Sequence, residues 1–203
     1  EQHLTAFLLA CARHPALLRA EVPTRRALDA LLALDVESAL QRLELGIQPT
    51  RPQLVRLASE KGPLSAVTEV AVTADLDRTV AAFRAGPLPR RLRSIEVVLP
   101  PPDSLRGRPA HAAFFATRLP VPTVALSTYA VRVSVTGDEA LVESSWRGGV
   151  PELVRALPKG LARVTLRSHP DWPLAGPEVG DVTQLRPVLE ERAREVIVEP
   201  PFV

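Results

Sequence analysis

One ten-residue pattern occurs twice in this chain, and it limits the fold more than any other feature. It covers residues 88–97 and 157–166, and both copies read L-P-x-x-L-x-x-[IV]-x-[VL]. The core of the string is an apolar-x-x-apolar-x-apolar pattern. Because side chains alternate along a strand, the fourth and sixth core residues point into one interior, which the first residue fills from the preceding turn. A single unit leaves too much apolar surface exposed, so the pattern predicts units that stack on one another.

Weaker copies of this core occur elsewhere in the chain. Their starting points are about 25 to 40 residues apart, a range typical of stacked supersecondary repeats. We expect them at Val67/Val70/Val72, Val121/Val124/Leu126 and Ala193/Val196/Val198, with Thr128/Val131/Val133 as a rival to the second of these.

From residue 62 onward, short β-branched runs alternate with stretches of helical character. Strands that alternate with helices need crossover connections, so the pattern predicts an α/β fold with mainly parallel strands. One hairpin is expected, with Gly137 and Asp138 at its turn. The expected strands are 67–73, 95–99, 123–128, 131–136, 140–144, 163–167 and 195–199, and the expected helices are 76–85, 110–118, 151–157 and 182–193.

The first part of the chain reads as helix alone. Thr24 is a suitable N-cap, and apolar residues at 28, 31, 32, 36, 39, 40 and 43 continue a helical stripe that Gly46 would end. Thr50, with Pro52 in the first turn, opens a further helix that ends before Gly62. We therefore expect a helical N-terminal cap at 1–61 without strands, and a repeat-like strand and helix body at 62–203.

The repeated segment resembles the leucine-rich-repeat family, in particular its longer-repeat forms, over residues 67–198. The resemblance implies an irregular solenoid with helices on the convex side and a strand face that binds a partner. In that family an Asn or Cys usually follows the segment and bonds the backbone between turns, whereas this chain has no Asn and its one Cys is Cys11. The alternative is a compact α/β sheet domain. Strand order distinguishes the two, because a solenoid keeps the order of the sequence and a doubly wound sheet reverses it.

Composition narrows the class of protein and of partner. One cysteine cannot form an internal disulfide, and no apolar run approaches the roughly 18 residues that span a bilayer. The 25 basic residues exceed the 23 acidic ones by only two, and all but Lys61 and Lys159 are Arg residues spread along the chain. This usage is typical of a GC-rich bacterial genome and does not indicate a phosphate-binding surface. We therefore expect a cytoplasmic protein that contacts neither membrane nor nucleic acid, although a signal segment could have been removed before Glu1.

No pattern in the sequence indicates catalysis, a metal or a cofactor. None of the four histidines lies four residues from another, and the chain has no CxxC, HExxH, GxGxxG, P-loop or GxSxG motif. Cys11 continues the apolar stripe of Leu4, Phe7 and Leu8, so we interpret it as a buried core thiol rather than a nucleophile. We expect no catalytic residue, no metal and no cofactor.

The remaining candidate is the outward surface of the strands. A strip of mixed charge with one tyrosine is typical of a protein-binding face. The sequence therefore favours a non-enzymatic module that binds another protein through this face. The alternative is a small α/β enzyme or small-molecule-binding domain whose site residues come from loops, which a deep apolar pocket would favour. The expected partner-binding residues are Glu69, Arg93, Glu96, Tyr129, Arg132, Arg163, Thr165, Arg167 and Glu195.

Overall fold

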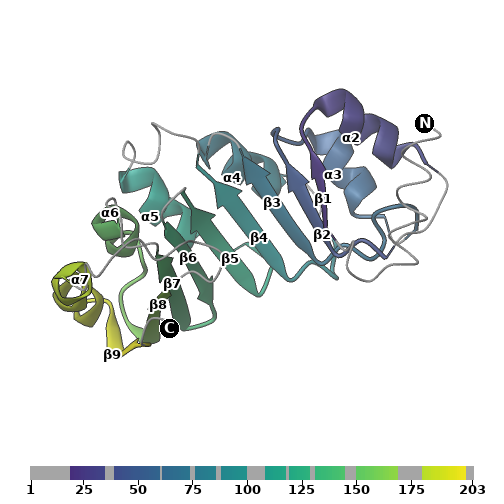
Figure 1. Cartoon of the computed structure of the whole chain (residues 1–203). Helices are drawn as coiled ribbons and strands as arrows, with labels where there is room; N and C mark the ends of the chain where they lie inside the picture. Colours follow the sequence, from purple (N-terminus) through teal and green to yellow (C-terminus); the bar gives the residue numbers. More distant parts are fainter. Residues whose placement is uncertain are drawn as a thin grey trace. The chain divides into compact units, whose positions relative to one another are not determined.

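A computed structural model shows an α/β protein in which short strands alternate with helices (Figure 1). It describes residues 19–34, 39–59, 61–73, 76–85, 88–99, 108–117, 119–128, 131–144, 150–168 and 180–199. The chain forms two compact units. The first comprises residues 1–98 with 119–121, and the second comprises 99–118 with 122–203.

The sheet of the first unit is entirely parallel. Its four strands are β1 (Arg19–Val22), β2 (Arg42–Leu45), β3 (Glu69–Thr73) and β4 (Ser94–Val98), and they lie side by side in chain order. The helices α2 (Arg25–Leu32), α3 (Arg51–Leu57) and α4 (Leu76–Ala85) connect them. Because crossovers between parallel strands are right-handed, strands that advance in one direction place their helices on one face of the sheet.

The sheet of the second unit is mixed. The strands β5 (Thr123–Ser127), β6 (Val131–Thr136) and β7 (Glu139–Ser144) are antiparallel, and β8 (Leu161–Ser168) and β9 (Ala193–Val198) continue the sheet in parallel with β7. These strands also keep chain order. The helices of this unit are α5 (Arg108–Ala116), α6 (Val150–Arg155) and α7 (Gly180–Glu190).

The expected α/β class, the mainly parallel pairing and the β6–β7 hairpin are confirmed. Gly137 in the hairpin turn has a φ of 61°. A two-residue turn of this kind needs positive φ, which glycine adopts without the steric cost that a Cβ adds. The pairing of β5 with β6 was not expected and adds a second antiparallel pair.

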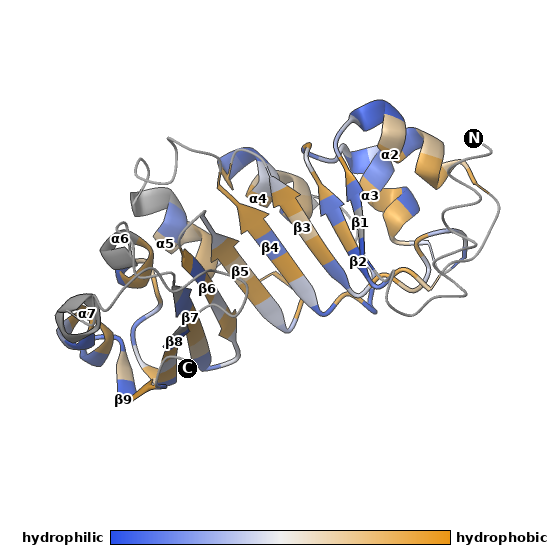
Figure 2. Cartoon of the chain, in the orientation of Figure 1, coloured by the Kyte–Doolittle hydropathy of each residue, from blue (hydrophilic) through white to orange (hydrophobic). Residues whose placement is uncertain are grey.

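The repeat cores fill the interior of both units. Leu92, which precedes β4, and Leu161, which begins β8, are 2% and 4% exposed, so their equivalence as buried residues is confirmed. The core positions Ile95 and Val97 of the first copy are fully buried as well. In Figure 2, β3 and β4 are hydrophobic over most of their length, with narrow hydrophilic bands that belong to the other face. The last copy differs, since Val198 on β9 is 41% exposed.

The prediction of a purely helical segment at 1–61 is wrong, because β1 and β2 lie within it. Helix α2 begins after its expected N-cap, where the Thr24 hydroxyl accepts a 3.2 Å hydrogen bond from the Ala27 amide, but it ends at Leu32. Leu40, Leu43 and Leu45 form a further repeat core, and all three are buried. Leu40 and Leu43, three positions apart, fit a helical stripe, whereas Leu43 and Leu45, two positions apart, fit the alternation of a strand. Pairing of β2 with β3 decides for the strand and joins residues on either side of 61 in one sheet.

Three other sequence expectations concern this region of the chain. The expected start of a helix after Thr50 is confirmed by α3, and the Gln53 side chain accepts a hydrogen bond from the Thr50 amide at 2.8 Å. The expected domain boundary at residue 61 stays a prediction. The expected helix around Cys11 lies outside the described residues.

Three arginines each connect the end of one helix to a later segment of the chain. Arg56 donates to the Leu32 carbonyl at 2.5 Å, Arg91 to the Leu57 carbonyl at 2.7 Å, and Arg192 to the Leu157 carbonyl at 3.2 Å. These carbonyls belong to the last turn of a helix or to the residues directly after it, where backbone acceptors lack helical partners. The guanidinium groups thus supply donors from a part of the chain that is remote in sequence.

Candidate functional site

One side of each sheet carries charged side chains in rows that run across the strands. In the first unit the strand register aligns Arg19, Arg42 and Glu69 in one row, and Glu21, Glu44 and Glu96 in the next. In the second unit it aligns Glu139, Arg163 and Glu195 in one row, and Arg132, Glu143 and Arg167 in another. We call these sides the charged faces. The intervening residues of the same strands point the opposite way into the core, as strand alternation requires.

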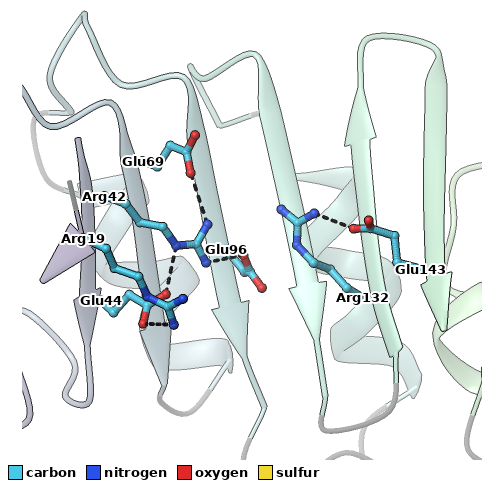
Figure 3. Close-up of polar contacts among 7 residues, drawn as sticks. All are labelled: Arg19, Arg42, Glu44, Glu69, Glu96, Arg132 and Glu143. Atoms are coloured by element: carbon cyan, nitrogen blue, oxygen red, sulfur yellow. Dashed lines mark hydrogen bonds and ion pairs between the residues drawn. The ribbon is translucent and has the colours of Figure 1, made fainter. Parts of the chain in front are cut away.

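Arg42 is the centre of the charged face in the first unit (Figure 3). Its Nε, Nη1 and Nη2 donate to Glu44 Oε1 at 2.9 Å, Glu69 Oε2 at 3.1 Å and Glu96 Oε2 at 3.1 Å. Burial alone would lower the pKa of Arg42, but the hydrogen bonds and charges of Glu44 and Glu96 outweigh it and raise that pKa. Three carboxylates therefore hold the Arg42 guanidinium in place.

The charged face of the first unit carries an excess of acid. Arg19 Nη2 bonds Glu44 Oε2 at 2.6 Å, so Glu44 bridges two arginines. With Arg42 this makes two arginines, against the four glutamates at 21, 44, 69 and 96. Glu96 is 5% exposed, and a carboxylate so far from water needs such a partner to stay ionised.

Glu143 is the centre of the corresponding cluster in the second unit. Arg132 Nη1 donates to its Oε2 at 2.8 Å (Figure 3), and Arg167 Nη2 donates to its Oε1 at 2.8 Å. Burial alone would raise the pKa of Glu143, which is 4% exposed, but the two guanidinium groups outweigh it and lower that pKa. Ser127 lies in the same row, and its buried hydroxyl has no hydrogen-bond partner among the residues that the structure describes.

The accessible part of this face lies on β7, β8 and β9. Arg163 bonds Glu195 at 2.8 Å and Glu139 at 3.3 Å, and these three side chains are 45%, 54% and 56% exposed. The pKa of Arg163 is raised by the hydrogen bond and the charge of Glu195. The neighbouring row, defined by the register, is Leu141, Thr165 and Ile197, of which Ile197 is 36% exposed.

The structure brings most of the sequence-predicted site residues onto these faces. Glu69 and Glu96 lie on the first face, and Arg132, Arg163, Thr165, Arg167 and Glu195 lie on the second. Arg93 is exposed just before β4, and Tyr129 lies outside the described residues. Their role in binding a partner stays a prediction.

Sequence analysis missed residues that hold the predicted ones in place. They are Arg19, Arg42, Glu44, Glu139 and Glu143. The signal was available as charged residues on both sides of a core leucine or valine, as in Arg42-Leu43-Glu44. It was overlooked at β1 and β2 because that region was interpreted as helix.

His111 on α5 is the described histidine, and it lies in the core. It is 2% exposed, its Nδ1 has no hydrogen-bond partner within the described ranges, and burial lowers its pKa. No group of three or more His, Cys, Asp or Glu residues in the described part of the chain could hold a metal ion. None of the described helices is long and apolar enough to cross a membrane. Comparison with protein-family models, with curated proteins and with solved structures found no match.

Proposed function

We propose that this chain is a non-enzymatic interaction module that binds another protein through the charged face of β7–β9. The observation that carries the proposal is the row of Leu141, Thr165 and Ile197, whose exposed Ile197 lies beside the half-exposed ion-pair row of Glu139, Arg163 and Glu195. Protein interfaces combine an apolar centre with a polar rim in this way. The ion pairs hold the charged side chains in place before binding, which lowers the entropy lost on association.

We propose further that the fold is an irregular solenoid of leucine-rich-repeat type. Within each unit the strands keep chain order, as stacked repeats do and doubly wound sheets do not. The family uses an Asn or Cys to bond the backbone between turns. Here the guanidinium groups of Arg56, Arg91 and Arg192 bond backbone carbonyls of earlier segments and would serve the same purpose.

Site-specific photo-crosslinking tests the proposal. A benzophenone amino acid replaces Thr165 on the charged face, and a matched protein carries it at Arg186, which is 63% exposed on α7. Both are irradiated in cells that naturally contain the protein, and the adducts are identified by mass spectrometry. We expect a protein adduct from position 165 that is absent from position 186.

Affinity measurements with the purified partner then separate binding from chance proximity. Ile197→Glu and Arg163→Glu should each weaken binding about tenfold or more, which corresponds to about 1.4 kcal/mol. Arg186→Glu is the control and should leave the dissociation constant unchanged. Equal affinities for all three variants, or adducts from position 186 alone, would overturn the proposal.

The second candidate is a small-molecule-binding domain with a loop-borne site. A groove of about 630 Å³ at the start of β8, away from the charged face, favours it. The two candidates use different residues, and both can hold for one chain.

A further inference from the structure

The groove lies where the second copy of the repeated string turns into β8. We call it the β8 groove. Its lining includes Phe115 from α5, Asp138 from the hairpin turn, Leu157, Lys159 and Leu161 from the string, and Arg192 from the turn before β9. Its volume of about 630 Å³ is in the range of sites that hold small organic molecules.

Core side chains form the apolar floor of the β8 groove. Phe115, Leu157 and Leu161 are all buried, so they belong to the core as well as to the groove. The Phe115 ring packs edge-to-face against Phe114, with ring centroids 5.3 Å apart. Side chains fixed in this way give an apolar ligand a preformed contact surface.

Two cations border this apolar surface. Lys159 is exposed, and its ammonium group makes no hydrogen bond or ion pair within the described part of the chain. Arg192 uses Nη1 to bond the Leu157 carbonyl at 3.2 Å, which fixes the guanidinium in place while other N–H donors remain. Asp138, also exposed, opposes them with one negative charge, so the groove keeps an excess of one positive charge.

The first copy of the string builds a second groove of similar character. Leu88, Pro89, Arg90 and Arg91 line a space of about 540 Å³ in the first unit. Arg90 follows the proline as Lys159 does, and Arg91 bonds a carbonyl at the end of α3 as Arg192 bonds one after α6. In both grooves a cation follows the proline of the repeated string, whereas Arg192 comes from the turn before β9 and lies outside the string.

We propose that the β8 groove binds small organic carboxylates with an apolar body of aromatic size. The carboxylate would accept hydrogen bonds from Lys159 and Arg192, and the body would lie against Phe115, Leu157 and Leu161. Charge-assisted hydrogen bonds fix the orientation of the ligand, and burial of its apolar body adds affinity. The carboxylate and the apolar body can be tested separately. A carboxylate that lacks an apolar body should bind poorly, and so should an uncharged compound that has the same apolar body.

The chain offers a sharp test because it contains two lysines, Lys61 and Lys159. Reductive methylation with ¹³C-formaldehyde keeps their charge and gives each an NMR signal, which Lys61→Gln and Lys159→Gln assign. The intact chain is titrated with 3-phenylpropionate, with its uncharged analogue 3-phenylpropanamide, and with acetate. We expect 3-phenylpropionate to shift the Lys159 signal to saturation and to leave Lys61 unmoved, while the other two compounds leave both signals unmoved.

Calorimetry on unmethylated protein measures the dissociation constant of 3-phenylpropionate, for which we expect opposite changes on substitution of two exposed residues. Lys159→Gln should raise the dissociation constant of 3-phenylpropionate about tenfold, because a charge-assisted bond is lost. Asp138→Asn should lower it several-fold, because a repelling carboxylate is removed. Lys61→Gln is the matched control and should change nothing. No saturable shift at Lys159 up to about 10 mM ligand, equal shifts at both lysines, or equal binding of the amide would overturn the proposal.

Discussion

Arg42 and Glu143 show how single residues organise the charged faces. Arg42 meets three carboxylates, and Glu143 meets two guanidinium groups. Each of these two side chains is surrounded by several side chains of opposite charge. Removing Arg42 would leave carboxylates without this partner, and removing Glu143 would leave guanidinium groups without this partner. Breaking a buried pair from one side costs more than the pair contributes, because the remaining charge has lost water without gaining a partner. These two residues are therefore structural, and the contacts that we propose with a partner involve the more exposed charges around them.

Acid should destabilise the protein partly through His111. Its pKa is lowered below 6.5 by burial, so the unfolded chain binds a proton before the folded chain does. The stability is complete above pH 6.5 and declines below it, by at most about 1.4 kcal/mol per pH unit, until the folded pKa is reached. Glu143 acts in a lower range: its stabilisation is complete above 4.5 and is lost as the pH falls through its lowered pKa.

Urea unfolding of the wild type and of His111→Leu at pH 7.5 and pH 5.5 measures this contribution. The leucine removes the titrating group. We expect the variant to lose less stability than the wild type between the two pH values. The same loss in both proteins would show that other groups cause the acid sensitivity.

At the scale of the element, the repeat core is the unit of stability. The first core residue closes the turn before a strand, and the other two fill the layer between sheet and helices. This arrangement explains why Leu92 is buried although it precedes the first residue of β4. It also explains β2, whose core of Leu40, Leu43 and Leu45 is buried in the same manner.

Truncation of the first core residue should therefore be costly in both units. Leu92→Ala and Leu161→Ala should each lower the free energy of unfolding by about 2–5 kcal/mol, because each leaves a cavity in a packed interior. Val55→Ala on α3 is the control, since Val55 is 51% exposed, and it should cost less than about 0.5 kcal/mol. Chemical denaturation measures all three. A cost below about 1 kcal/mol for either leucine would contradict the assigned equivalence.

At the scale of the whole molecule, basic and acidic residues are nearly equal in number. The formal net charge is +2. Six described arginines, those at 19, 42, 132, 163, 167 and 186, bond glutamates of the same chain. Arginines paired in this way bind few phosphates, because each would have to give up its bond to a glutamate of the same chain in order to bind a phosphate of the DNA.

The protein should accordingly not bind duplex DNA at physiological salt. Fluorescence anisotropy of a labelled duplex, titrated with protein between about 50 and 200 mM salt, measures this. We expect no binding at about 200 mM salt. Any binding at lower salt should change only weakly with the salt concentration. A slope equivalent to about six or more phosphate contacts would contradict the expectation.

The sequence by itself determined the features that depend on neighbouring residues. The Thr24 and Thr50 caps, the Gly137 turn and the strands that follow Leu92 and Leu161 were readable because a few adjacent side chains decide them. Strand alternation also placed most of the candidate site residues on the outward side of the sheet.

The tertiary structure alone decided the rest. In residues 40–45 a helical spacing overlaps the alternation of a strand, and the pairing with β3 decides for β2. Register across separate strands brings Arg42 to Glu96, and the packing of a hairpin turn, a helix and two loops forms the β8 groove. Contacts between distant segments depend on how the stacked elements align, which a linear pattern does not encode.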